Sequence, residues 1–285
     1  MAKKLIPVAI AYDFDGTLAP GNMQEHSFLP EIGQTPSVFW AETKALAKKN
    51  DMDEILAYMY LMLKHANSRE VAITRENFVK HGKTISFFDG VESWFDRINA
   101  HGKTLGLNVE HYIISSGLRE LVDGTKIRKN FKYVFASGFM YDANGVAIWP
   151  ALAINYTNKT QHLFRINKGI DNAFDNAKIN KFMEPEARPV PFSNMIYIGD
   201  GETDIPAMKM VKYQGGYSVA VYDRSKRKTK GRQSAKDAVH QLLEQERADY
   251  AVPADYSAGQ PLDRIVKAAL EKIAVENRLH SDRKR

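Results

Sequence analysis

Residues 7–20, PVAIAYDFDGTLAP, begin as an apolar run and end in two aspartates one residue apart. The run from Val8 to Tyr12 is typical of a strand buried on both faces, because parallel sheets covered by helices have continuous apolar strands. Residues i and i+2 of a strand lie on one face, so Asp13 and Asp15 are expected to share a site at its carboxyl end, where α/β sheets bind ligands. The alternative is that both aspartates are turn or capping residues.

The composition is typical of a globular protein, and it excludes cysteine chemistry. The chain has 285 residues, of which 44% are hydrophobic and 26% charged, and it contains no cysteine. Disulfides, thiolate catalysis and cysteine-ligated metals are therefore excluded. Any metal site has to use oxygen or imidazole ligands.

The N-terminal residues MAKKLIPVAIAY imitate a signal peptide, but the apolar run is short and leads directly into the aspartates. We expect a strand there, no membrane span and a cytoplasmic protein. The net charge is +6, with basic runs at 223–236 and 278–285. Such runs attract anions or nucleic acid, or they are solvated surface. Neither run contains aromatic residues that would stack on bases, which argues against a nucleic-acid partner.

Further apolar, β-rich segments alternate with helical patterns along the chain. This alternation predicts an α/β fold with a Rossmann-like, three-layer parallel sheet. The further predicted strands are 110–116, 132–137, 194–200, 217–222 and, as a short edge strand, 248–255.

Helix starts are indicated by capping residues. Asp51 and Glu54 resemble a capping box before an amphipathic run, and Thr74 is expected to cap a short helix. The segment 89–102 reads as a helix that Gly102 ends. Further helices are predicted at 117–130, 160–168, 204–212, 234–246 and 260–278.

The chain between the first two strands is too long for a simple crossover. We therefore expect residues 20–85 to form an inserted helical cap, with residues 1–19 and 86–285 forming the core. Asn144-Gly145 within 139–150 is a typical hairpin turn, and this hairpin is expected to be a flap on the sheet.

A second acidic pair follows another predicted strand, in IGDGETD. Asp200 comes directly after the strand, and Asp204 lies one turn later at the start of a helix. Short carboxylates at two strand ends suit Mg²⁺, which prefers oxygen ligands. Asp204 could equally be a simple helix N-cap.

Hydroxyl groups follow a third strand, in YIISSGLRE. Ser115 and Ser116 stand before Gly117 and a predicted helix, and hydroxyls and free amides at such a position bind phosphate oxygens. A serine N-cap is the simpler alternative.

The motifs DFDGT, IISSG and IGDGETD, in this order, resemble those of the haloacid dehalogenase (HAD) superfamily of phosphohydrolases. The resemblance covers about residues 8–222 and is greatest to phosphoserine-phosphatase-like members with a helical C1-type cap. It implies a Mg²⁺-dependent phosphatase acting on a small phosphorylated metabolite.

The resemblance also implies residue roles. Asp13 would be the nucleophile and form an aspartyl phosphate, and Asp15 would be the general acid and base. Mg²⁺ would be held by Asp13, the backbone carbonyl of Asp15 and Asp200, with Asp204 as a ligand or orienting water.

Phosphate oxygens would be bound by Ser115 and by the amides of Phe14, Asp15 and Ser116. The family also requires a lysine. Lys159 is favoured because a helix is predicted to begin there, which makes residues 170–190 an insertion. Lys178 and Lys181 are the alternatives, and the spacing of Lys178 from the second acidic pair fits the family better.

Other functions stay open at this stage. They are a phosphotransferase or phosphomutase, a phosphatase of nucleic-acid ends that docks through 223–236, and a non-catalytic phosphate-binding module. Phosphoserine phosphatases hold the substrate amine with an acidic residue shortly after the first motif. Here the comparable residue is Asn22, with Glu25 further on, so the substrate is not identified. The Met-rich and aromatic helices after the first motif would either line a substrate pocket or pack the cap.

Overall fold

The protein is described by a computed structural model that covers residues 5–71, 73–225 and 234–283. The strands of the described residues form one sheet in the order β4-β3-β2-β1-β5-β6-β7. All neighbouring pairs are parallel except β3 and β4. The strands are β1 (Ile6–Tyr12), β2 (Leu107–Leu118), β3 (Phe131–Tyr141), β4 (Ala147–Leu152), β5 (Met195–Gly199), β6 (Tyr217–Tyr222) and β7 (Tyr250–Pro253).

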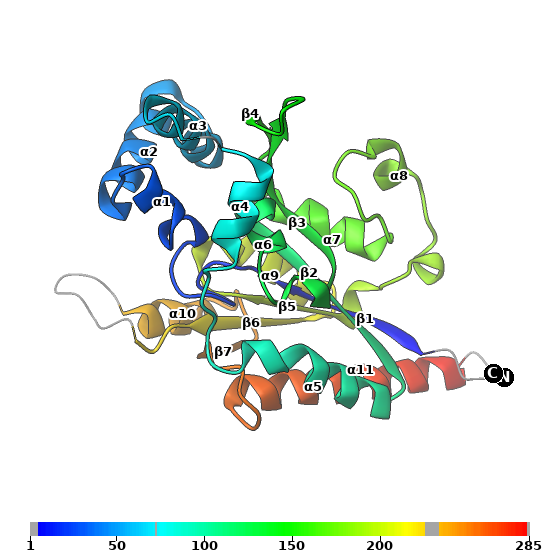
Figure 1. Ribbon diagram of the computed structural model, residues 1–285. Helices are drawn as coiled ribbons and strands as arrows, with labels where there is room; N and C mark the ends of the chain where they lie inside the picture. The colour runs from blue at the N-terminus through cyan, green and yellow to red at the C-terminus, as the bar shows by residue number, and fades with distance from the viewer. Residues whose placement is uncertain (1–4, 72, 226–233, 284–285) are drawn as a thin grey trace.

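Helices cover both faces of this sheet, so the predicted α/β fold is confirmed (Figure 1). The helices are α1 (Phe28–Glu31), α2 (Pro36–Asn50), α3 (Glu54–Ser68), α4 (Arg75–Gly82), α5 (Val91–Thr104), α6 (Arg119–Asp123), α7 (Lys159–Asn167), α8 (Asn176–Asn180), α9 (Ile205–Tyr213), α10 (Ala235–Glu244) and α11 (Pro261–Arg283). Among the described residues, no helix is both long enough and apolar enough to span a membrane.

Strand β1 contributes alternate residues to two separate cores. Val8, Ile10 and Tyr12 pack with residues of α5 and α11 on one face. Ala9 and Ala11 pack with residues of α7, α9 and α10 on the other. Because side chains alternate along a strand, a strand covered on both faces has to be apolar throughout. This requirement explains why residues 8–12, before the two aspartates, are apolar without interruption.

Helices α1, α2 and α3 lie in the long segment between β1 and β2 and stand together at one end of the sheet (Figure 1). Helix α4, later in the same segment, packs instead against α6. A Cβ at Gly82 would lie 2.0 Å from the carbonyl oxygen of Leu121, and one at Gly124 would lie 2.0 Å from that of Val79. Two glycines facing each other thus let these two helices approach backbone to backbone.

Several predicted helix boundaries were wrong. Asp51 ends α2 with φ of 50°, and Asp53 caps α3 by accepting from the amides of Ile55 and Leu56. Gly102 lies inside α5, which continues to Thr104.

The helix predicted at 117–130 is reduced to the five residues of α6 and a 3₁₀ turn at Arg128–Asn130. Strand β2 extends to Leu118 and leaves α6 little chain before β3 begins. By contrast, Thr74 caps α4 as predicted, with its hydroxyl accepting from the amide of Asn77. The hairpin also forms, and Gly145 occupies a positive φ of 74° in the turn between β3 and β4.

Candidate active site

Three central strands end at one cavity. In the sheet, β1 lies between β2 and β5. The residues that follow or end these strands therefore meet, and Asp13, Ser115 and Asp200 all line a cavity of about 610 Å³. Asp15 and Ser116 line it as well. The structure thus brings together the side chains that the sequence placed at three strand ends.

Lys159 is the lysine that reaches this site. It is the first residue of α7 and has no exposed surface, and its Nζ lies 3.1 Å from Asp13 Oδ1 and 2.7 Å from Asp204 Oδ1. The two alternatives lie on the surface. Lys178 pairs with Asp175 at 3.3 Å, and Lys181 is exposed in the segment after α8.

The buried Lys159 ammonium forms ion pairs with two carboxylates, those of Asp13 and Asp204. Burial lowers the pKa of Lys159, but the facing carboxylates of Asp13 and Asp204 outweigh it, so the pKa is raised and the ammonium stays charged. The pKa of Asp13 is raised to about 6, first by burial and also by Asp204, although Lys159 acts against both. A single lysine therefore does not fully compensate the pair.

The Asp204 carboxylate connects several residues of the site and is not a simple N-cap. Its side chain makes no capping hydrogen bond to α9. Instead its Oδ1 accepts from Lys159 and from the Tyr197 hydroxyl at 2.7 Å, and its Oδ2 accepts from the Asp200 amide at 3.2 Å. Sequence reasoning missed Tyr197, whose position within the β5 run looks like ordinary core. Burial raises the pKa of Tyr197 well above its usual value and keeps the hydroxyl protonated as a donor.

Asp15 is fixed by the chain that follows it. Its Oδ1 accepts from the Met23 amide at 2.8 Å, and Met23 Sδ in turn accepts from the Leu118 amide at 3.1 Å. Burial, followed by the charge of Asp13, raises the pKa of Asp15 well above its ordinary value. Met23 therefore links the first motif to the end of β2, a role with no local sequence signal.

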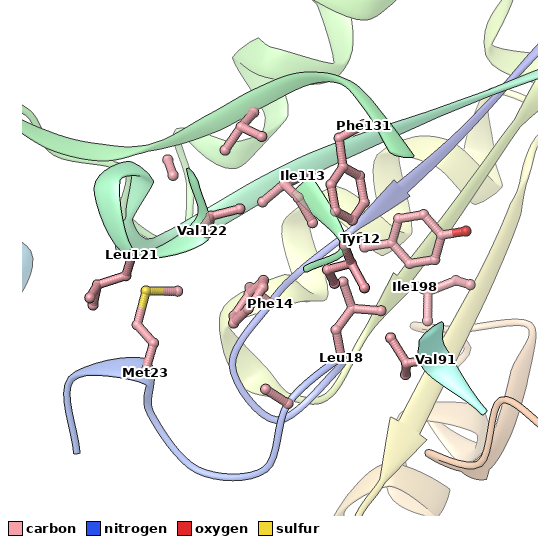
Figure 2. Packing of buried hydrophobic residues seen from close by; sticks show 14 of the residues in the cluster. Tyr12, Phe14, Leu18, Met23, Val91, Ile113, Leu121, Val122, Phe131 and Ile198 are labelled. Carbon is pink, nitrogen blue, oxygen red and sulfur yellow. The ribbon is translucent and has the colours of Figure 1, made fainter. Parts of the chain in front are cut away.

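Gly16 lets the two acidic motifs touch. It has φ of 74°, and a Cβ there would lie 2.0 Å from Asp200 Oδ2. Only glycine combines this backbone conformation with such a close approach. Figure 2 shows Phe14 among Leu18 and Val122 in the hydrophobic core, where it has no exposed surface. The Phe14 side chain therefore belongs to the core, and a role of Phe14 in the site would have to use its backbone.

The last residues of β2, which include Ser115 and Ser116, are held by contacts on two sides. Ser115 Oγ accepts from the Gly117 amide at 3.0 Å and does not cap α6, which begins at Arg119. The Ser116 carbonyl accepts from the Tyr58 hydroxyl at 2.7 Å and from Ser137 Oγ at 3.1 Å. Ser116 Oγ is buried without a hydrogen-bond partner in the described chain, although the residue lines the cavity.

Helices α2 and α3 supply the opposite wall of the cavity, through Trp40, Lys44, Glu54, Ile55 and Tyr58. The Met-rich part of this segment packs the interior, since Met59 and Met62 have no exposed surface and do not line the cavity.

Two further contacts hold this wall in place, one within residues 20–85 and one to the core. Glu25 Oε1 accepts from both Asn22 Nδ2 and Trp40 Nε1 at 2.6 Å, so Asn22 and Glu25 act together. Asp53 Oδ2 accepts from Asn155 Nδ2 at 2.8 Å, which joins the start of α3 to the segment before α7.

The acidic side chains fit a small divalent cation. Asp13, Asp200 and Asp204 each offer a carboxylate oxygen, and these oxygens lie within 4.8 Å of one another. Carboxylate oxygens are the ligands that Mg²⁺ prefers, and the incompletely compensated charge around Lys159 favours a second cation. Because Asp204 already accepts three hydrogen bonds, Asp13 and Asp200 are the better candidates for direct ligands.

This fold and site define a Rossmann-like α/β protein with a cluster of acidic side chains at the carboxyl ends of its central strands. Residues 10–209 match the family model of the haloacid dehalogenase-like hydrolases, and the chain belongs to this family.

Individual relatives are distant. An uncharacterised protein of Borreliella burgdorferi is 29% identical over 232 residues, which cover 72% of this chain and 78% of the relative. A HAD family hydrolase from Salmonella enterica serovar Typhi has a TM-score of 0.56 at 16% identity, over 92% of this chain and 71% of that one. A phosphoserine phosphatase, solved as an analogue of its phospho-aspartyl intermediate, has a TM-score of 0.53 at 16% identity, over 92% and 99%. At these identities the solved structures support the shared fold.

Proposed function

We propose that this protein hydrolyses phosphate monoesters of small molecules, with Asp13 as the nucleophile and Mg²⁺ as the cofactor. The observation that carries the proposal is the placement of Asp13. Its carboxylate lines the cavity at the end of β1, while Lys159 binds the same carboxylate from behind and is fully buried. A carboxylate held this way can approach phosphorus despite the negative charge of a phosphate ester.

In the first step, an oxygen of Asp13 attacks phosphorus in line and the bond to the ester oxygen breaks. The leaving alkoxide takes a proton from the Asp15 carboxyl, which the Met23 amide holds in place. Asp15 then removes a proton from water, which attacks the phosphoryl group on Asp13 and releases inorganic phosphate. General acid–base catalysis of this kind contributes about 10²- to 10⁴-fold.

Most of the acceleration has to come from charge stabilisation, because uncatalysed hydrolysis of phosphate monoesters is among the slowest reactions known. The remaining phosphoryl oxygens would be bound by the Ser115 hydroxyl and by the amides of Phe14, Asp15 and Ser116. For Asp15, Ser115 and Ser116 this role is supported by the cavity lining, and two hydrogen bonds fix the Ser116 carbonyl.

Asp13 and Asp200, with the Asp15 carbonyl, would hold Mg²⁺. Asp204 would orient Lys159 and any water in this shell. When bound, the ion would offset the negative charge shared by the phosphate and the nucleophile.

We also propose that residues 20–85 act as a cap on a core of residues 1–19 and 86–285. The wall that α2 and α3 place over the strand ends supports this division. A wall of this kind excludes water and selects the substrate. The cavity suits a small phosphorylated metabolite, because sites for small ligands typically enclose about 300–1,000 Å³. The cytoplasmic location stays a prediction. The basic segment 223–236, suggested as a docking patch for nucleic acid, lies largely outside the described residues.

The test is phosphate release from p-nitrophenyl phosphate, glycerol 3-phosphate and phosphoserine, with Mg²⁺ and with EDTA. We expect turnover only with Mg²⁺, and a loss of about 10³-fold or more in Asp13→Asn. Asp96→Asn on the exposed face of α5 is the matched control and should keep full activity. Turnover that survives in Asp13→Asn would refute the assignment of the nucleophile.

Mass analysis of the reaction with added glycerol separates hydrolysis from transfer. A hydrolase releases inorganic phosphate equal to the ester consumed, whereas a phosphotransferase forms a new ester of glycerol. Predominant transfer would replace the proposed reaction with phosphotransfer at the same aspartate.

A further inference from the structure

A second cavity of about 440 Å³ lies apart from the active site and shares no lining residue with it. It is bounded by the first residues of α4 and α6, by β3 and β4, and by the loop 172–174. Its volume is within the range of small-molecule sites. The proposed phosphatase reaction uses none of its residues.

The cavity contains two arginines held by aromatic rings. The guanidinium carbon of Arg75 lies 4.3 Å from the ring centroid of Tyr141, and that of Arg119 lies 5.6 Å from the centroid of Tyr133. The Nε of Arg119 is buried without a hydrogen-bond partner among the residues that the structure describes. A guanidinium supported by a ring keeps its N–H groups available for a carboxylate or phosphate.

Glu120 lines the same cavity and has an unsatisfied oxygen. The residue is 2% exposed, and its Oε1 accepts from the Phe139 amide at 3.3 Å. Its Oε2 and the Tyr141 hydroxyl are both buried and interact with each other, but they do not reach the geometry of a well-formed hydrogen bond. A buried carboxylate oxygen without a well-formed hydrogen bond is unfavourable, so it indicates a place where a ligand donor would bind.

Burial raises the pKa of Glu120, although the Tyr141 hydroxyl, the Phe139 amide and the charge of Arg75 act against it. A ligand that brings its own donor would stabilise the charged carboxylate.

The loop 172–174, which forms the remaining wall of the cavity, is held by hydrogen bonds from Arg165. Arg165 on α7 is 1% exposed, and its guanidinium donates to the carbonyls of Asn172 and Ala173 at 3.1 Å and to Asn176 Oδ1 at 3.2 Å. These bonds fix the loop that carries Phe174, which lines the cavity and is 82% exposed. The hydrogen bonds of Arg165 therefore hold this part of the cavity wall in place.

We propose that this second cavity binds a small organic anion that also carries a hydroxyl or amino group, with its acid groups on Arg75 and Arg119 and its donor on Glu120. Two guanidinium groups and one carboxylate leave the cavity with a net charge of +1, which suits a hydroxy or amino acid with two carboxylates.

The cavity is connected to the proposed active site through β3. Ala136 and Gly138 line the cavity, while Ser137 between them donates to the Ser116 carbonyl at the end of β2. Adjacent residues of a strand face opposite sides of the sheet, so a ligand on one side of β3 would affect the end of β2 through Ser137 on the other side. We therefore expect the ligand to change turnover, an effect that rests on the proposed function.

The test uses three probes that differ by one group: succinate, L-malate with an added hydroxyl, and L-aspartate with an added amine. Isothermal titration of the full chain should show L-malate or L-aspartate binding about tenfold or more tightly than succinate, because a hydrogen bond to a charged group is worth about 1.5–3 kcal/mol. This preference should disappear in Glu120→Gln, and all affinity should fall about tenfold or more in Arg119→Gln.

Controls separate this site from the active site. Arg188→Gln and Asp13→Asn should bind the probes like the wild type, and thermal unfolding should show that every variant is folded. Equal affinity for the three probes, no heat of binding at about 10 mM, or loss of binding in Asp13→Asn would overturn the proposal. Titration needs no turnover, so failure of the phosphatase proposal leaves this test intact. The effect on turnover is measured separately, as p-nitrophenyl phosphate hydrolysis with and without L-malate.

Discussion

Replacement of Lys159 by methionine tests whether the buried lysine holds the two motifs together. The side chain has no exposed surface, and it bonds to Asp13 at 3.1 Å and to Asp204 at 2.7 Å, where water cannot screen the charges. Removal of one partner of a buried ion pair lowers the free energy of unfolding by about 3–5 kcal/mol. Here two carboxylates lose their cation at once, so we expect a loss of about 4 kcal/mol or more at pH 8.

The assay is urea unfolding in EDTA, so that no metal replaces the lysine. Lys178→Met is the matched control, because its side chain is 70% exposed and pairs only with Asp175 on the surface. It should change the free energy of unfolding by about 0.5 kcal/mol or less. A loss below about 1 kcal/mol in Lys159→Met would refute the reasoning.

A double variant tests the coupling directly. Asp204→Asn removes one of the two like charges that Lys159 compensates. Combined with Lys159→Met, it should destabilise the protein by at least about 1 kcal/mol less than the sum of the single variants, because the two groups share one interaction. Additive losses would mean that the two residues stabilise the fold independently.

Three further predictions concern the same region. Gly16→Ala and Gly145→Ala introduce a Cβ at the same φ of 74°, but only the first overlaps a site carboxylate. Only Gly16→Ala should abolish turnover and Mg²⁺ binding, measured by phosphate release and by titration, and inactivity of both variants would show that backbone strain alone is responsible. Tyr58→Phe should lower kcat/KM about fivefold, because it removes a bond to the Ser116 carbonyl worth about 1 kcal/mol, and an unchanged kcat/KM would separate this bond from catalysis. Burial lowers the pKa of His111 to about 3, so this imidazole binds a proton in the unfolded chain at a higher pH than in the folded one. The free energy of unfolding should therefore fall as the pH drops below about 6.5, by about 2 kcal/mol at pH 5. Urea unfolding at pH 7 and pH 5 measures this loss, which should shrink in His111→Gln.

Sequence reasoning found the parts of the site that follow a strand. Asp13, Ser115 and Asp200 each come directly after or within a buried apolar run, and parallel strands necessarily bring their carboxyl ends to one edge. Lys159 was preferred to Lys178 and Lys181 because a helix was expected to begin there. In the structure, α7 begins at Lys159.

The contacts between the proposed cap and the core were not foreseen. Tyr58 donates to Ser116, 58 residues away, and it belongs to a helix whose other buried residues, apart from Ile55, pack the interior. Met23 acts through its amide and its sulfur, which any interior methionine also possesses. The predicted N-cap of α3 was wrong by two residues, because Asp51 and Asp53 are both good capping residues. Only the left-handed backbone at Asp51 shows that this residue ends α2 and that Asp53 caps α3.

The position of β1 in the middle of the sheet has a consequence for folding. Ile10 of β1 pairs with His111 on one side and with Ile196 on the other. Contacts this distant in sequence form slowly, because a long loop has to close before they are made. During synthesis, the most apolar strand of the protein is made first and then lacks its second neighbour until roughly two thirds of the chain has followed. Assembly of the site and protection of this strand from aggregation thus depend on the same late event, the docking of β5.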